Sequence, residues 1–198
     1  GLGGLCAGRG ALDEAQSRVS RAIEARPGAA AYHNSLGNIL QRRGAHAAAE
    51  AAFRRAIALD RHLAQAHANL GHTLRATGRH DEAVASCRSA LALAPTLVSA
   101  WAGLGQAQLA AGACDDAVAS FETALAHLQA LRRRPGAGLA GHRLRRHLEE
   151  HALGRAVQAF QRRLAVQRQR LPGRRQQAQA RRAADLQLNV QVLRQQPR

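Results

Sequence analysis

A period of 34 residues is the feature of this sequence that most constrains its fold. Identical residues recur at this step over four consecutive units, in the columns that begin at Leu2, Gly3, Gly10, Ala15 and Ala22. Periods of roughly 20–50 residues are typical of proteins built from stacked supersecondary units. Each unit alone cannot bury its apolar face, so neighbouring units must pack on one another. The period therefore predicts a one-dimensional stack of repeats.

Composition indicates that the repeating unit is helical. Hydrophobic residues make up 46% of the chain but aromatic residues only 3%, and the apolar fraction is mostly Ala and Leu, which are strong helix formers. Apolar residues at helical spacing predict helices over residues 31–43 and 47–59, with Gly44 as the helix stop between them. Asp13, Asp81 and Asp115 are predicted to lie at the start of each unit's second helix, where a carboxylate meets unpaired N–H groups.

The glycine column that contains Gly71 is predicted to lie within the first helix of each unit. Glycine in a helix interior costs about 1 kcal/mol relative to alanine, so a column of four such glycines needs a structural reason. We expect close approach of the two helices of a hairpin, with the small Ala column of the second helix opposite the glycine.

These columns resemble the tetratricopeptide repeat. The matching residues in units two to four are Leu36-Gly37, Ala49, Phe53 and Ala56; Leu70-Gly71, Ala83, Ala90 and Pro95; and Trp101, Leu104-Gly105, Ala117, Phe121 and Ala124, while Pro27 closes unit one. The departures are Arg61 and Gln129 where Pro is usual, Cys87 and Val19 in place of the second aromatic, and Leu40, Leu74 and Gln108 in place of the usual Tyr. The resemblance implies an all-α, right-handed superhelical solenoid of antiparallel helix pairs over residues 1–131, with units of about 1–29, 30–63, 64–97 and 98–131, the first of them truncated.

The resemblance also implies a binding surface, because the first helices of such repeats line a concave groove. The polar residues that this geometry places there are Asn34, Asn38, Gln41, Arg42, His72, Arg75, Ser99 and Gln106. Amide side chains offer donors and acceptors to an extended peptide backbone, and Arg42 and Arg75 are candidates to hold a carboxylate. The complete basic site of chaperone-tail binders is not expected, since Ala68 and Ala102 occupy lining positions. The alternative is a solvated polar face without a ligand.

The C-terminal third differs in charge from the repeats. Residues 1–131 carry 12 Arg and 10 acidic residues, whereas residues 132–198 carry 17 Arg and 3 acidic residues. We expect a linker over 132–141, a capping helix over 142–171 and a basic, disordered tail over 172–198. An Arg-rich tail attracts phosphates by salt-sensitive contacts, which makes nucleic acid an alternative partner. A stretch of Arg, Gln, Ala and Leu is also what an out-of-frame reading of a GC-rich gene yields.

Sites for catalysis or metals find little support. His147 and His151 fit an H-x-x-E-H motif and are a candidate zinc pair, but the sequence beyond them offers no Glu as third ligand. Three widely spaced cysteines form neither a disulfide framework nor a zinc pattern, and free thiols favour a reducing, cytoplasmic location. Cys87 and Cys114 are expected to pack as small apolar residues. No apolar run approaches the length of about 20 residues that a membrane span requires. We therefore expect no cofactor and no enzymatic activity.

The sequence thus predicts a scaffold that binds a protein or peptide partner. The chain has no Met, even at position 1, so we expect a fragment of a longer protein. Two alternatives stay open. One is a non-catalytic accessory module of a larger bacterial enzyme of the glycosyl- or sulfotransferase type, by resemblance only. The other is a nucleic-acid-associated adaptor that acts through its Arg-rich tail.

Overall fold

The structure is a computed structural model that describes residues 2–132, with side chains from residue 10 to residue 130. These residues form seven helices and no strand: α1 (Leu2–Ala25), α2 (Ala30–Arg42), α3 (His46–Leu59), α4 (Ala64–Ala76), α5 (His80–Leu93), α6 (Val98–Ala111) and α7 (Cys114–Arg132). The chain divides at Pro95 into two compact units, one with α1–α5 and one that begins at Thr96. None of the described helices is long and apolar enough to cross a membrane. The expected linker, capping helix and basic tail, with His147 and His151, lie outside the described residues.

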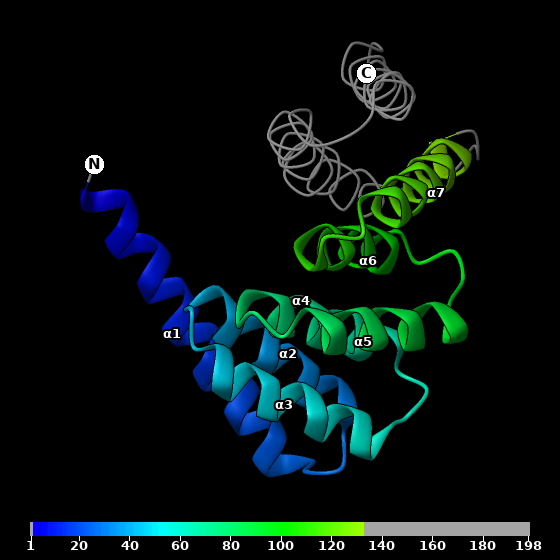
Figure 1. Cartoon of the computed structure of the whole chain (residues 1–198). Coiled ribbons are helices and arrows are strands. Elements are labelled where there is room, and N and C mark those ends of the chain that lie inside the picture. Colours follow the sequence, from blue (N-terminus) through cyan, green and yellow to red (C-terminus); the bar gives the residue numbers. More distant parts are fainter. Residues whose placement is uncertain (1, 133–198) are drawn as a thin grey trace, which may run out of the picture. The chain divides into compact units, whose positions relative to one another are not determined.

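Two helical hairpins, α2–α3 and α4–α5, form most of the first unit (Figure 1). Their helices end within one residue of the bounds predicted for 31–43 and 47–59. The turns contain Gly44 and Gly78 with φ of 76° and 82°, the left-handed region in which glycine has no Cβ penalty. The helix stop predicted at Gly44 is therefore confirmed. Helix α4 packs on α3 and also contacts α2, so the two hairpins stack.

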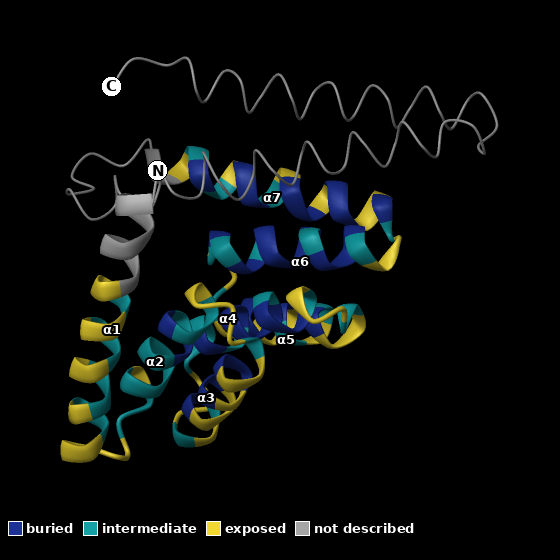
Figure 2. Ribbon diagram, turned by 90° about the vertical axis from the view of Figure 1, so that its left-hand side faces the viewer, coloured by how far each residue is buried: buried dark blue, intermediate teal, exposed yellow. Residues whose placement is uncertain are grey.

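The core of these hairpins is made by small residues around a few large ones. Ala49, Phe53 and Ala56 of α3 are fully buried, as are Ala83 and Cys87 of α5. Figure 2 shows the buried residues of these helices on the sides that face one another. Phe53 and Cys87 occupy the same column of the repeat, so a ring in one hairpin is replaced by a thiol in the next.

The glycine column lies at a close helix–helix contact, as predicted. A Cβ added to Gly37 would lie 2.5 Å from the Phe53 ring, and one added to Gly71 would lie 2.6 Å from Cys87 Sγ and 3.1 Å from the Ala83 carbonyl oxygen. The group opposite the glycine is therefore the aromatic or thiol column, and the expectation of the Ala column was wrong. The reason is size, because only the longer side chain reaches across to the facing helix.

Unit one is not a hairpin in the structure. Helix α1 runs without a break from Leu2 to Ala25, so Gly10 lies inside it where the column predicted a turn, and Asp13 is not at a helix start. Residues 2–9 contain three Gly and two Leu, which is little apolar surface for a separate helix. Continuing the helix keeps its backbone hydrogen bonds. Asp81 and Asp115 do lie in the first turns of α5 and α7.

Two histidines fasten the loops that precede their helices. The Nε2 group of His33 donates to the Pro27 carbonyl oxygen at 3.0 Å, and Nε2 of His67 donates to that of Arg61 at 3.1 Å. Donors and acceptors are each 34 residues apart, so the repeat reproduces a tertiary hydrogen bond. His67 is therefore a structural residue of its loop.

The second unit contains one described hairpin, α6–α7. Its turn has Gly112 at φ 90°, and a Cβ on Gly105 would lie 2.6 Å from the Phe121 ring. Within this hairpin, the Oγ of Ser120 donates to Gln108 Oε1 at 2.6 Å, and both side chains are buried. Both features place the polar groups of this hairpin inside it.

Candidate functional site

Four amide side chains from α2 and α4 converge on one face of the first unit. Asn34 and Asn38 are one turn apart on α2, and Gln65 and Asn69 are one turn apart on α4. Residues four apart lie on the same side of a helix. The stacking of the two hairpins brings the two pairs together, and we call these four residues the amide cluster.

Asn69 is the centre of the amide cluster. Its Nδ2 donates to Asn34 Oδ1 at 3.0 Å and to Asn38 Oδ1 at 2.9 Å, and its Oδ1 accepts from Gln65 Nε2 at 3.0 Å. The residue is 8% exposed. Because an amide nitrogen carries two N–H groups, both donors of Asn69 are used within the cluster.

This arrangement fixes which groups the other three amides keep for a ligand. The oxygens of Asn34 and Asn38 face Asn69, so their NH₂ groups are left to donate. Gln65 has used its nitrogen toward Asn69 and retains its oxygen as an acceptor. All three side chains are half-buried and reach the surface. The cluster therefore presents donors along α2 and an acceptor on α4.

The structure brings together only some of the residues predicted for the groove. Asn34 and Asn38 are joined through Asn69, and the half-buried Gln41 follows on α2. Arg42 is the last, exposed residue of α2. Of the others, His72 and Arg75 are half-buried on α4, while Ser99 and Gln106 are half-buried on α6 in the second unit.

Gln65 and Asn69 were missed by sequence reasoning. Asn34 repeats as Ala68 and Ala102, so that column suggested that the polar surface ends after α2. The adjacent column, Ser35 and Asn69, carries the amide that matters. The signal available was the pair Gln65 and Asn69 at helical spacing on α4.

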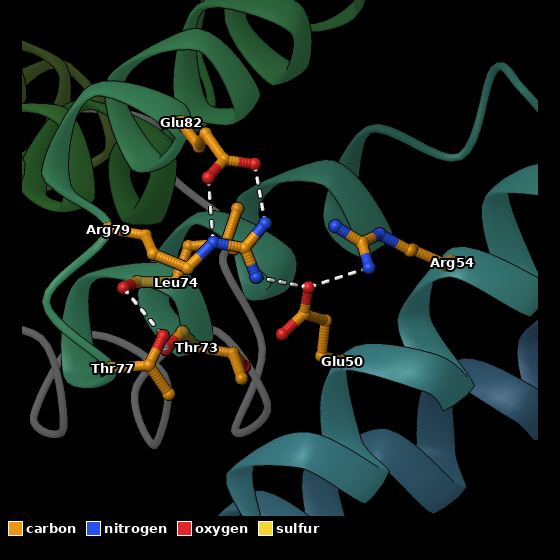
Figure 3. Close-up of polar contacts among 7 residues, drawn as sticks. All are labelled: Glu50, Arg54, Thr73, Leu74, Thr77, Arg79 and Glu82. Atoms are coloured by element: carbon orange, nitrogen blue, oxygen red, sulfur yellow. Dashed lines mark hydrogen bonds and ion pairs between the residues drawn. The ribbon is translucent and has the colours of Figure 1, made fainter.

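A charged network joins the second helices of the two hairpins (Figure 3). Glu50 on α3 is 9% exposed, and its Oε1 accepts from Arg54 at 2.7 Å and from Arg79 at 2.6 Å. Arg79, just before α5, also donates to both oxygens of Glu82 at 2.5–2.6 Å. The hydrogen bonds from Glu82 and Glu50 raise the pKa of Arg79, and the bond from Arg79 lowers the pKa of Glu82. All members are therefore ionised at neutral pH, and the network acts as a link between hairpins.

Cys87 is the buried nucleophile of the first unit. Burial raises the pKa of its thiol to about 12, against a weaker opposing effect of Arg75. A thiol with that pKa is protonated at neutral pH, and the thiol form is a poor nucleophile. Cys87 and Cys114 are both buried, as predicted. Among residues 2–132, no three His, Cys, Asp or Glu side chains are grouped so that they could hold a metal ion.

Comparison with solved structures finds similar folds. Two crystal structures of MamA are each 25% identical to this chain. The first has a TM-score of 0.56 and covers 62% of this chain and 72% of that chain; the second has a TM-score of 0.54 and covers 65% and 70%. The second TPR domain of the human RPAP3 protein, in complex with an HSP70 peptide, is 27% identical with a TM-score of 0.46, and the match covers 48% of this chain and 79% of that chain.

Comparison of the sequence with protein families gives a direct assignment. No curated protein matches the sequence. Residues 7–64 and residues 62–130 match two family models, both described as tetratricopeptide repeat. These two stretches contain the described hairpins, their turn glycines and the amide cluster. The chain therefore belongs to the tetratricopeptide repeat family.

Proposed function

We propose that this chain is a scaffold that binds an extended segment of a partner protein across the first helices α2 and α4. The observation that carries the proposal is the amide cluster, in which two hairpins jointly hold Asn34 and Asn38 with their N–H groups available. Family membership supports a role in protein interaction. The mechanism is display of a shaped polar surface, without a chemical step.

The physical argument rests on what an extended peptide offers. Its backbone carries unpaired C=O and N–H groups along both edges, and main-chain hydrogen bonds supply affinity when such a segment docks. Helices α2 and α4 have 13 residues each, which corresponds to about 20 Å. A segment of about six residues, at about 3.3 Å each, spans that length. Gln41 and Arg42 at the end of α2 extend the surface beyond the cluster.

A peptide-display selection on the full chain tests the proposal. Random peptides of about twelve residues, which reach about 40 Å when extended, are selected against it, and the best binders are synthesised. Their dissociation constants are then measured by fluorescence anisotropy for the full chain and its variants. We expect Asn34→Ala combined with Asn38→Ala to weaken binding by about tenfold or more, since each lost hydrogen bond costs about 1 kcal/mol.

Ser89→Ala is the matched control. Ser89 is exposed on α5, and its hydroxyl donates only within its own helix, to the Ala85 carbonyl oxygen at 3.1 Å. We expect this variant to bind as the unmodified chain does. Equal binding by the double Asn variant would show that the selected peptides dock elsewhere, and would refute the proposed site.

A further inference from the structure

We infer that the amide cluster recognises the main chain of an internal, uncharged stretch of the partner, and that Asn69 is the positioning residue that sets this preference. The inference rests on the proposed function, because it names the class of segment that the same site takes. It differs from that proposal in excluding a terminal carboxylate and charged side chains as the recognised groups.

The first argument is the neutrality of the cluster. Its hydrogen bonds connect Asn34, Asn38, Gln65 and Asn69 only with one another. A carboxylate that leaves water needs charged partners or several N–H donors to offset its desolvation. Alanine, in Ala68 and Ala102, follows at the 34-residue step from Asn34, so that column supplies no cation. Peptide groups are neutral and are recognised by amides at a lower desolvation cost.

The second argument is the orientation of the amides. Because Asn69 takes the oxygens of Asn34 and Asn38, these two present donors, and Gln65 presents an acceptor. An extended residue directs its own C=O and N–H toward the same side, as in a hydrogen-bonded pair of antiparallel strands. One residue of a bound segment thus offers an acceptor for α2 and a donor for Gln65 of α4. A carboxylate offers acceptors only and leaves the Gln65 oxygen without a donor.

Asn69 decides this polarity because of its own burial. At 8% exposed it has little access to water, and its two N–H groups need protein acceptors. The Asn34 and Asn38 oxygens are those acceptors. In Asn69→Asp, the side chain keeps its shape but only accepts. Asn34 and Asn38 must then turn their nitrogens inward and present oxygens outward, which reverses the face that a peptide carbonyl meets.

The experiment uses the full chain and the selected peptides, each synthesised as free acid, as C-terminal amide, and with single backbone esters that replace an N–H by oxygen. We expect free acid and amide to bind within about twofold of one another, and affinity to fall less than about threefold between 50 mM and 500 mM salt, because no screened ion pair contributes. One ester position is expected to lose about tenfold, the loss of the donor to Gln65.

Asn69→Asp is expected to weaken binding by more than about tenfold, with an unchanged far-ultraviolet circular dichroism spectrum. In Gln65→Ala, the sensitive ester is expected to lose its effect, because the acceptor is gone. A merely structural role of Gln65 would lower affinity equally for amide and ester peptides.

The outcomes separate this inference from the proposed function. Peptides that lose affinity in the Asn34/Asn38 double variant, but require the free carboxylate or dissociate at high salt, would overturn the inference and keep the binding site. Full affinity in Asn69→Asp would also overturn it. Peptides that ignore the double variant would remove the site itself.

Discussion

The hairpins α2–α3 and α4–α5 and the hairpin α6–α7 share a period, a turn and a glycine contact, yet they use polar groups differently. In the first unit, Asn69 reaches Asn34 across 35 residues and Arg79 reaches Glu50 across 29 residues. In α6–α7, the printed buried polar pair, Ser120 with Gln108, stays within the hairpin. Polar links between hairpins create a surface with exposed donors, whereas a pair closed inside a hairpin satisfies itself. The same fold therefore carries a site in one region and a self-contained core in another.

The largest expected effect tests whether the two regions have equivalent cores. Phe53 and Phe121 are both fully buried in the same column. Phe53→Ala and Phe121→Ala should each lower the free energy of unfolding by about 3–5 kcal/mol, because each leaves a cavity beside a glycine that cannot fill it. Urea unfolding followed by circular dichroism measures both. A loss below 1.5 kcal/mol in one variant alone would show that the two hairpins are not packed alike.

The glycine contact gives the next effect, and it sharpens the comparison between hairpins. An added Cβ at Gly71 meets Cys87 Sγ at 2.6 Å and the Ala83 backbone oxygen at 3.1 Å. Backbone cannot move aside as a side chain can, so Gly71→Leu should cost about 1–3 kcal/mol. Gly28→Ala is the control, because nothing lies within 4 Å of its added Cβ. An unchanged unfolding midpoint for Gly71→Leu would contradict the close contact.

The smallest expected effect concerns the charged network and pH. The hydrogen bond from Arg79 lowers the pKa of Glu82 below its ordinary value of 4.5. A carboxyl with a depressed folded-state pKa stabilises the fold above its unfolded pKa, and this contribution is lost as pH falls through the folded one. We expect the thermal midpoint to drop on acidification below about pH 4.5, and Glu82→Gln to lack this component. Identical pH profiles for the two proteins would show that the pair contributes nothing measurable.

Much of the fold was predictable from local sequence signals. Helix bounds, the turn at Gly44 and the packing role of Cys87 follow from residue type and spacing, which act over one or two helical turns. Repetition extended each local inference to the next unit. It failed at Gly10, where the column continued but residues 2–9 offer too little apolar surface for a separate helix.

The site was only half predictable. Asn34 and Asn38 were placed correctly by analogy between units, whereas Asn69 and Gln65 were not foreseen. Glu50 gave no signal in the sequence that it would be buried and paired with Arg79. These partners belong to different hairpins, and no short-range pattern encodes which side chains meet when hairpins stack.

The sequence by itself determined that this chain is a stack of helical hairpins, because a 34-residue period and helix-stop glycines act through local backbone hydrogen bonding and the burial of an apolar face. The tertiary structure decided which hydrogen-bonding groups are used up and which are left for a ligand. Asn69 removes two oxygens and leaves two NH₂ groups, and that choice depends on distances between helices. Those distances are set by the close packing of Gly37 against Phe53 and of Gly71 against Cys87, since a stacked hairpin can approach its neighbour only as far as its largest facing side chains allow.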